Sequence, residues 1–391
     1  MNPPARLPVA PGGRDPLVVC VLAAADAIAA NQRHHAQRAV HRLLAHTAAG
    51  STAVQRVTRI IGQSLHARLA GDLSGSGNLY QEPPHPQDML AAFQLLLDGT
   101  PFIRTGYTGA NLTIMEVLGD APRWHIVDIG IGSGTQWQHF LALLAGRGVS
   151  LPQVRLTGID IPAPGPDPSH RLREVAARLQ HHAAALGVPF SCEMLASPIE
   201  AVDVTALQPH ATDALVINAA FALHHTAAGD GVVDPARSRD AVLRRLHGLQ
   251  PRLLMLVEPD AEHNALPFVP RVREAMAHYL TVFDALNELL PGDRPARAVI
   301  EQAFFGREML NIIAGEGPLR VERHERHTAW QRRLAIADFT AIDLGHLRSH
   351  LKRSLKLTPP CDLLGVSGGL ALAWKGVPLV AVSAWKPQEQ G

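Results

Sequence analysis

From residue 124 onward, short apolar runs alternate with helical stretches, and this alternation constrains the fold more than any other feature of the chain. The runs that read as buried strands are 124–128, 154–159, 190–194, 214–217 and 253–257. The helical stretches between them are 135–145, 169–186 and 236–249. Strands buried on both faces and joined by helices are typical of a parallel sheet, so the pattern predicts an α/β fold. Two last runs, 369–374 and 379–384, predict an antiparallel hairpin.

The residues before this alternation are helical instead. Apolar residues recur at spacings of three and four between 17 and 70, and two further helical patterns cover 87–97 and 110–118. After the fifth strand, a longer helical insertion is expected. The sequence therefore predicts a disordered Pro/Gly-rich tail at 1–15, an N-terminal helical cap at 16–120, and an α/β core at 121–391 with a helical cap insertion at about 264–315.

Charge and cysteine content exclude several classes of function. Lys and Arg number 36 and Asp and Glu 35, so the formal net charge is +1 and no nucleic-acid partner is expected. The three cysteines are far apart and form neither a disulfide framework nor a metal motif, which indicates a reducing, cytoplasmic setting. The apolar run at 16–25 could be the core of a signal peptide, but it continues with helical spacing and is interpreted as a buried helix. No run is long enough to span a membrane, so no membrane partner is expected.

A glycine loop follows the first predicted strand. Asp128 ends that strand, and Gly130, Gly132 and Gly134 come before the helix that opens at Thr135. Glycines let the backbone turn sharply and approach a ligand, and an acid in the loop suits a cationic head such as that of S-adenosylmethionine. A dinucleotide site would favour the spacing G-x-G-x-x-G, so a nicotinamide-dependent oxidoreductase is a weaker alternative.

The second predicted strand ends at Asp160, whose carboxylate can accept hydrogen bonds from both ribose hydroxyls of a nucleoside. The alternative is a tight strand-to-helix turn with a solvated aspartate. Strand, glycine loop, helix, strand and aspartate together favour nucleoside binding.

At this point the sequence resembles the GRAS family, along about 17–386 and through motifs in a fixed order. The strand at 124–128 resembles the family's V-H-I-I-D motif, and 134–137 resembles its G-x-Q-W. The further motifs are V-N-x-x-F-x-L-H around 216–224, V-E at 257–258 with H-N at 263–264, Y-F-x-R-E at 304–308, and R-V-E-R-H-E at 320–325. Each motif is weak alone, but their order is specific.

The resemblance implies a Rossmann-like class I methyltransferase sheet, mostly parallel with a C-terminal antiparallel hairpin, and a helical cap. Plant members of the family mostly act as protein-interaction platforms, whereas bacterial members are regarded as small-molecule methyltransferases. This chain keeps the three loop glycines, from which many plant members depart, and this favours a bacterial member that binds S-adenosylmethionine.

The resulting prediction is an S-adenosylmethionine-dependent methyltransferase, monomer or homodimer, that acts on a small-molecule acceptor and releases S-adenosylhomocysteine. The alternative is a non-catalytic regulatory, protein-interaction or small-molecule-binding protein that retains the nucleoside site.

Candidate catalytic residues follow the fourth and fifth strands, because ligands of parallel sheets bind beyond the carboxyl ends of the strands. His224, Glu258 and His263 are candidates for a general base, or they pin the structure instead. Asn218 and Phe221 are expected just after the fourth strand, where they resemble the N-P-P-Y/F motif of amino-group methyltransferases without its two prolines. In that motif the amide orients the amine and the ring stacks on the substrate; the alternative gives both residues a structural role.

Other residues are assigned to the substrate or the cap by their place in these motifs or in the insertion: Phe221, Asn264, Tyr279, Phe304, Phe305 and Arg307. Aromatic residues at helical spacing are equally typical of a hydrophobic core. No metal is predicted, because the sequence His324-Glu325-Arg326-His327 is one residue short of the H-E-x-x-H zinc motif.

Overall fold

The structure is a computed structural model that describes residues 15–48, 50, 52–72, 86–148, 150–207, 210, 212–292 and 294–388. Its chain divides into two compact units. The described parts of 1–101, 229–233 and 261–325 form the helical unit, and those of 102–228, 234–260 and 326–391 form the sheet unit. The chain therefore passes from the sheet unit to the helical unit and back around 229–233. The tail predicted at 1–15 lies outside the described residues except for Asp15.

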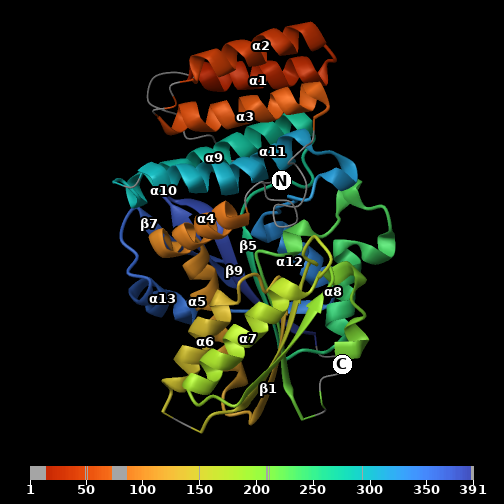
Figure 1. The fold of residues 1–391 in the computed structure, drawn as a ribbon, viewed down its shortest axis with the longest axis vertical. Coiled ribbons are helices and arrows are strands. Elements are labelled where there is room, and N and C mark those ends of the chain that lie inside the picture. The colour runs from red at the N-terminus through yellow and green to blue at the C-terminus, as the bar shows by residue number, and fades with distance from the viewer. Residues whose placement is uncertain are drawn as a thin grey trace. The chain divides into compact units, whose positions relative to one another are not determined.

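The sheet unit is built on one mixed sheet (Figure 1). Its strands are β1 (Arg123–Ile129), β2 (Gln153–Asp160), β3 (Phe190–Ala196), β4 (Ala214–Ala220), β5 (Leu253–Pro259), β6 (Phe339–Ile342), β7 (Cys361–Val366), β8 (Gly369–Trp374) and β9 (Val377–Pro387). The strand order is β3-β2-β1-β4-β5-β9-β8-β7, and β6 also pairs with β9. The first five strands are parallel to one another, and β9 joins β5 in the antiparallel sense.

This topology confirms the predicted α/β class, the five parallel strands and the C-terminal hairpin. It also adds two strands that the sequence pattern missed, β6 and β7. Because β1, β2, β4 and β5 are parallel, their carboxyl ends lie at one edge of the sheet, where ligands of such sheets bind.

The helices of the sheet unit are α5 (Pro101–Leu118), α6 (Thr135–Ala145), α7 (His170–Ala185), α8 (Arg239–Gly248), α12 (His327–Ile336) and α13 (Arg348–Ser354). α6 begins directly after the glycine loop, with Gly134 as its N-cap residue. Apolar residues of β1, β4 and β5 form a core with those of α8 and α12, including Ile217, Leu243 and Trp330. The rigid base of the candidate site is therefore the buried centre of the sheet.

The helices of the helical unit are α1 (Pro16–Ala29), α2 (Arg33–His46), α3 (Ala53–Ala70), α4 (Pro86–Gly99), α9 (Phe268–Leu289), α10 (Arg294–Val299) and α11 (Gly306–Ala314), with a π-helical turn at Ile300–Phe305. α1, α2 and α3 pack on one another, and α3 also packs on α9 and α11 (Figure 1). A capping box between Thr52 and Gln55 begins α3, and Gly71 ends it in the left-handed conformation. Among the described helices, none is both long and apolar enough to cross a membrane.

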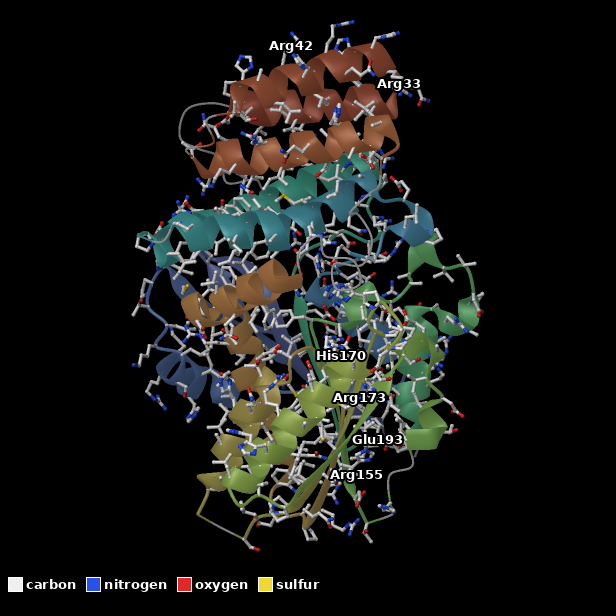
Figure 2. All side chains as sticks on the ribbon, in the orientation of Figure 1. Arg33, Arg42, Arg155, His170, Arg173 and Glu193 are labelled. Carbon is white, nitrogen blue, oxygen red and sulfur yellow. The ribbon has the colours of Figure 1, made fainter. Side chains whose placement is uncertain are left out.

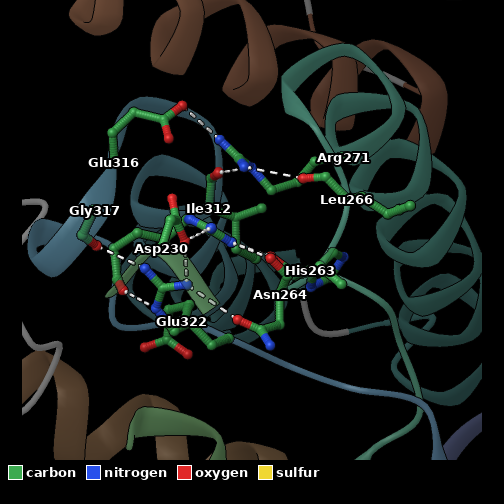
Figure 3. A network of polar contacts seen from close by, with 12 residues as sticks. Asp230, His263, Asn264, Leu266, Arg271, Ile312, Glu316, Gly317 and Glu322 are labelled. Atoms are coloured by element: carbon green, nitrogen blue, oxygen red, sulfur yellow. Dashed lines mark hydrogen bonds and ion pairs between the residues drawn. The ribbon is translucent and has the colours of Figure 1, made fainter. Parts of the chain in front are cut away.

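A cluster of buried arginines holds the segment 229–233 within the helical unit (Figure 3). The side chains of Arg320 and Arg323 are 1% exposed, and each places a guanidinium nitrogen 2.7 Å from Oδ1 of Asp230. Burial alone would raise the pKa of Asp230, but the hydrogen bond from Arg323 and the charge of Arg320 outweigh it and lower that pKa. One half-exposed carboxylate thus neutralises two buried cations.

We predict that Asp230→Asn destabilises the protein by about 1–3 kcal/mol at pH 7. Removing one partner of a fully buried ion pair costs about 3–5 kcal/mol, and the exposure of Asp230 reduces this cost. Because the pKa of Asp230 is lowered by folding, its contribution is present above the unfolded-state pKa and is lost as the pH falls through the folded-state pKa. Urea denaturation at pH 7 and in acid measures both effects.

The matched control is Asp234→Asn. Asp234 pairs with the exposed Arg237 at 3.8 Å and caps the turn that follows, a role that Asn fills equally well. If Asp230→Asn loses no more stability than this control, Asp230 does not stabilise the two buried arginines.

Candidate functional site

The glycine loop joins β1 to α6, and its three glycines have positive φ angles of 81°, 55° and 73° at Gly130, Gly132 and Gly134. A Cβ atom at Gly130 would lie 2.6 Å from Ala222, and one at Gly134 would lie 2.9 Å from Val175. These two glycines are therefore required by packing inside the protein. A Cβ atom at Gly132 would meet only a backbone oxygen at 3.9 Å, so this glycine alone borders open space.

The amides of the loop are largely engaged within the protein. Those of Gly130 and Ile131 donate to the carbonyl of Ile159, and that of Gly134 donates to the carbonyl of Ile131. A pyrophosphate cradle needs such amides to be directed at the ligand. The loop therefore does not fit a dinucleotide, in agreement with its glycine spacing.

Asp160 ends β2 and lies beside the loop. Its Oδ2 accepts a hydrogen bond of 2.9 Å from the amide of Gly132, and its Oδ1 accepts one of 2.8 Å from the amide of Ile161. A guanidinium nitrogen of Arg171 lies 3.2 Å from Oδ2. The carboxylate predicted to bind a ribose thus stands at the only loop glycine with open space, and it holds that glycine in place.

Asp128, in contrast, is buried at the centre of a polar network. Its Oδ2 accepts a hydrogen bond of 2.6 Å from the indole of Trp137, and its Oδ1 accepts one of 2.7 Å from the amide of Asn218. The network continues from Asn218 to Gln136, and from Gln136 to Asn111. Burial raises the pKa of Asp128 to about 7, against the opposing effect of the hydrogen bonds from Asn218 and Trp137.

Sequence reasoning gave no role to Tyr107 of α5, which lies above these strand ends. Its ring meets that of Phe221 edge to face, with the centroids 6.4 Å apart. Burial raises the pKa of Tyr107, and the charges of Asp128 and Asp160 raise it further, so a neutral phenol stands near both carboxylates. No helix-period or motif signal distinguishes this residue from a core aromatic.

The sequence predicts Asn218 just beyond the fourth strand, and this prediction is wrong. β4 runs on to Ala220, so Asn218 lies within the strand and is fully buried. The strand continues because Asn218 is satisfied by Asp128 and Gln136 and needs no turn. Phe221 follows with a φ of 58°, an uncommon conformation for a residue of its size.

His224 and Glu258 lie together in the sheet unit. Nδ1 of His224 is 2.5 Å from Oε2 of Glu258, and Oε1 of the same carboxylate accepts hydrogen bonds from the amides of Leu223 and His224. From the other side, the buried Arg239 donates to the carbonyl of His224 at 2.8 Å. The pair fixes the turn after β4 to the end of β5.

His263 and Asn264, which follow β5, belong to the helical unit, as do the residues predicted for the substrate or the cap other than Phe221, which lies in the sheet unit. Nδ1 of His263 is 2.9 Å from Nδ1 of His324, and the ring of His263 stacks with that of Tyr279 at 6.0 Å. Asn264 donates a hydrogen bond of 2.6 Å to Glu325.

The hydroxyl of Tyr279 donates to Glu308 at 2.8 Å, and burial raises the pKa of Tyr279. Phe304, Phe305 and Arg307 are buried in the same unit, with the two phenylalanine rings in edge contact. These residues are arranged as a packed interior of the helical unit.

Comparison with known proteins gives one family. The model of the GRAS domain family matches residues 17–386. Scarecrow-like transcription factor PAT1 of Arabidopsis thaliana is 32% identical, and the match covers 95% of this chain and 76% of the relative. The crystal structure of SCL7 from Oryza sativa is similar with a TM-score of 0.79 and 27% identity, covering 95% of this chain and 100% of that one.

A plantazolicin methyltransferase, BpumL, solved with S-adenosylhomocysteine, has a TM-score of 0.40 and 12% identity, covering 84% of this chain and 99% of that one. This likeness is too distant to carry an argument about the site.

We predict that Trp137→Phe destabilises the protein more at pH 8.5 than at pH 5.5, by about 1–3 kcal/mol of additional free energy. The substitution removes a hydrogen-bond donor from a buried carboxylate. Because folding raises the pKa of Asp128 to about 7, its carboxyl group is mostly protonated in the folded protein below that pH and ionised above it. Denaturant titrations at the two pH values measure the difference.

Trp124→Phe is the matched control, because Trp124 is equally buried but donates its indole N–H to the carbonyl of Ala121. It is expected to lose the same stability at both pH values. Equal pH dependence in the two variants would show that Trp137 acts only by packing.

Proposed function

The chain belongs to the GRAS domain family, and we propose that it is a regulatory or binding protein of that family whose α/β core holds a nucleoside ligand without transforming it. The curated relative PAT1 is named a transcription factor, which favours a regulatory role over one in metabolism. The ligand we propose is S-adenosylmethionine or S-adenosylhomocysteine.

The observation that carries this proposal is that the candidate catalytic groups of the sheet unit are engaged within the protein. To orient a substrate amine, Asn218 would need a free amide oxygen, yet its side chain is fully buried between Asp128 and Gln136. To take a proton from a substrate, His224 would need to be accessible, but the residue is 4% exposed and its Nδ1 binds Glu258. These groups are arranged to hold strand ends together.

The nucleoside site is supported by Gly132 and Asp160. Gly132 borders open space and presents backbone that a ligand can approach, and Asp160 beside it is 13% exposed at its side chain. A carboxylate at the end of the second strand is the group that accepts hydrogen bonds from ribose hydroxyls. Asp128 lies nearby and is bonded only by neutral donors in the contacts described above, so a cationic ligand would favour its ionised form.

A second candidate function is the S-adenosylmethionine-dependent methylation of a small molecule. It is favoured by the complete loop, in which Asp128 precedes three glycines that all have positive φ angles. When bound, S-adenosylmethionine supplies a methyl group that is already activated, so the protein would mainly align an acceptor and exclude water. An acceptor that is a neutral amine would need no general base.

We predict that the purified chain binds S-adenosylhomocysteine and that Asp160→Ala weakens binding by about 1.5–3 kcal/mol, the scale of charge-assisted hydrogen bonds. Gly132→Val is expected to abolish binding, because its side chain would fill the space beside Asp160. Calorimetry on the full chain measures both effects.

Two control variants match these changes. Asp167→Ala removes an exposed carboxylate on the same connection after β2, and Gly148→Val places a side chain at another glycine with positive φ and open surroundings. Both controls should bind like the unmodified chain. The proposal fails if the unmodified chain does not bind the nucleoside, or if the site variants bind as tightly as the controls.

A further inference from the structure

One arginine links the two parts of the proposed nucleoside site. Arg171 lies in the first turn of α7, and its side chain is 37% exposed. One guanidinium nitrogen is 3.2 Å from Oδ2 of Asp160, and the other donates a hydrogen bond of 3.0 Å to the carbonyl of Gly132. The first of these nitrogens also lies 3.4 Å from the carbonyl of Ile161. The same side chain therefore contacts both the carboxylate of Asp160 and the carbonyl of Gly132.

Counting acceptor positions shows what this contact does to Asp160. A carboxylate offers about four acceptor positions, two on each oxygen. Oδ1 accepts one hydrogen bond, from the amide of Ile161, and Oδ2 accepts one, from the amide of Gly132. The guanidinium of Arg171 forms an ion pair with Oδ2 on top of that hydrogen bond. The two adjacent hydroxyls of a ribose need one position on each oxygen. A hydroxyl that approaches Oδ2 therefore competes with the guanidinium that is paired with the same oxygen.

We infer that Arg171 is an internal competitor for the nucleoside: it occupies Asp160 in the free protein and must swing away when a ribose diol binds. This inference rests on the proposed function, since it concerns the same carboxylate.

Arg171 is the donor that leaves, because the alternative is a backbone amide. The N–H of Gly132 is held in place by the positive φ angle of the loop, whereas the arginine is a long side chain already partly in solvent. An ion pair of such exposure is weak, so its loss is easily offset by two hydroxyl hydrogen bonds. Figure 2 shows His170 and Arg173 in the same helical turn. Both side chains are exposed, at 59% and 62%, so the turn borders solvent into which Arg171 can move.

The competitor has two consequences for ligand choice. A nucleoside with both ribose hydroxyls gains most from displacing Arg171, so a 2′-deoxyribose analogue should bind more weakly. Salt screens ion pairs near a surface, so added NaCl should weaken the ion pair between Arg171 and Asp160. An uncharged nucleoside should therefore bind more tightly at higher salt. If Arg171 had only a structural role, salt would not strengthen nucleoside binding, and mutating Arg171 would not change the effect of salt.

The test measures the affinity of adenosine and of S-adenosylhomocysteine for the full chain, for Arg171→Met and for Arg178→Met. Arg178 is the matched control, because it lies on α7 and donates to the carbonyl of Ser133 at 2.7 Å. We expect Arg171→Met to bind both ligands about two- to fivefold more tightly, the range that corresponds to an exposed ion pair. Arg178→Met should bind like the unmodified chain.

Salt provides the second readout. Between about 50 mM and about 500 mM NaCl, the affinity of the unmodified chain for adenosine should rise, and that of Arg171→Met should stay constant. If Arg171→Met does not fold, Arg171→Gln replaces it in both measurements, with the same expected results.

The possible outcomes separate the two proposals. If the unmodified chain binds adenosine and the Arg171 variants bind it equally or more weakly, Arg171 does not compete with the nucleoside. The proposed nucleoside site would then still stand. A second result would also overturn the proposed competition. If the unmodified chain binds adenosine 2′,5′-bisphosphate more tightly than adenosine, and Arg171→Met does not, then Arg171 is a phosphate ligand. If neither the chain nor any variant binds, the proposed function itself fails.

Discussion

The carboxylate of Asp128 is the constraint on which the centre of this structure depends. It is buried at the end of the central strand, where a charge is costly unless hydrogen bonds compensate it. Trp137 supplies one bond from α6 and Asn218 supplies the other from β4. One acid thereby ties a strand, the helix after the glycine loop and the neighbouring strand into one rigid edge, at the place where a ligand of such a sheet binds.

This arrangement separates binding from catalysis. Buried residues that hold strand ends by hydrogen bonds are well suited to shape a site, but a substrate reaches them only if the surrounding structure opens. Asn218, His224 and Glu258 are of this kind. Gly132 and Asp160 differ, because one borders open space and the other has a contact with a half-exposed side chain that can be exchanged. The structural contacts and the proposed ligand contacts therefore involve different residues of the same edge.

Much of the fold could be predicted from sequence, because buried parallel strands and amphipathic helices leave strong periodic patterns. β6 and β7 were not predicted from the sequence. β6 has only four residues, and β7 is an outermost strand whose buried positions are interrupted by partly exposed ones. The acids and glycines of the site were also predictable from their spacing. Their partners were not: Trp137 looks like a core residue and Arg171 like a solvated helix residue, because the contacts that they make form only in the folded chain.

The most direct test of the account is the fate of S-adenosylmethionine bound to the full chain at stoichiometric amounts. The bound ligand would be incubated with a mixture of small-molecule acceptors of all common nucleophile types, and its conversion to S-adenosylhomocysteine would be followed by mass spectrometry. We expect S-adenosylmethionine to remain bound and intact, with conversion no faster than in buffer. Conversion that is faster than in buffer, and that Asp160→Ala abolishes, would contradict it and establish a methyltransferase.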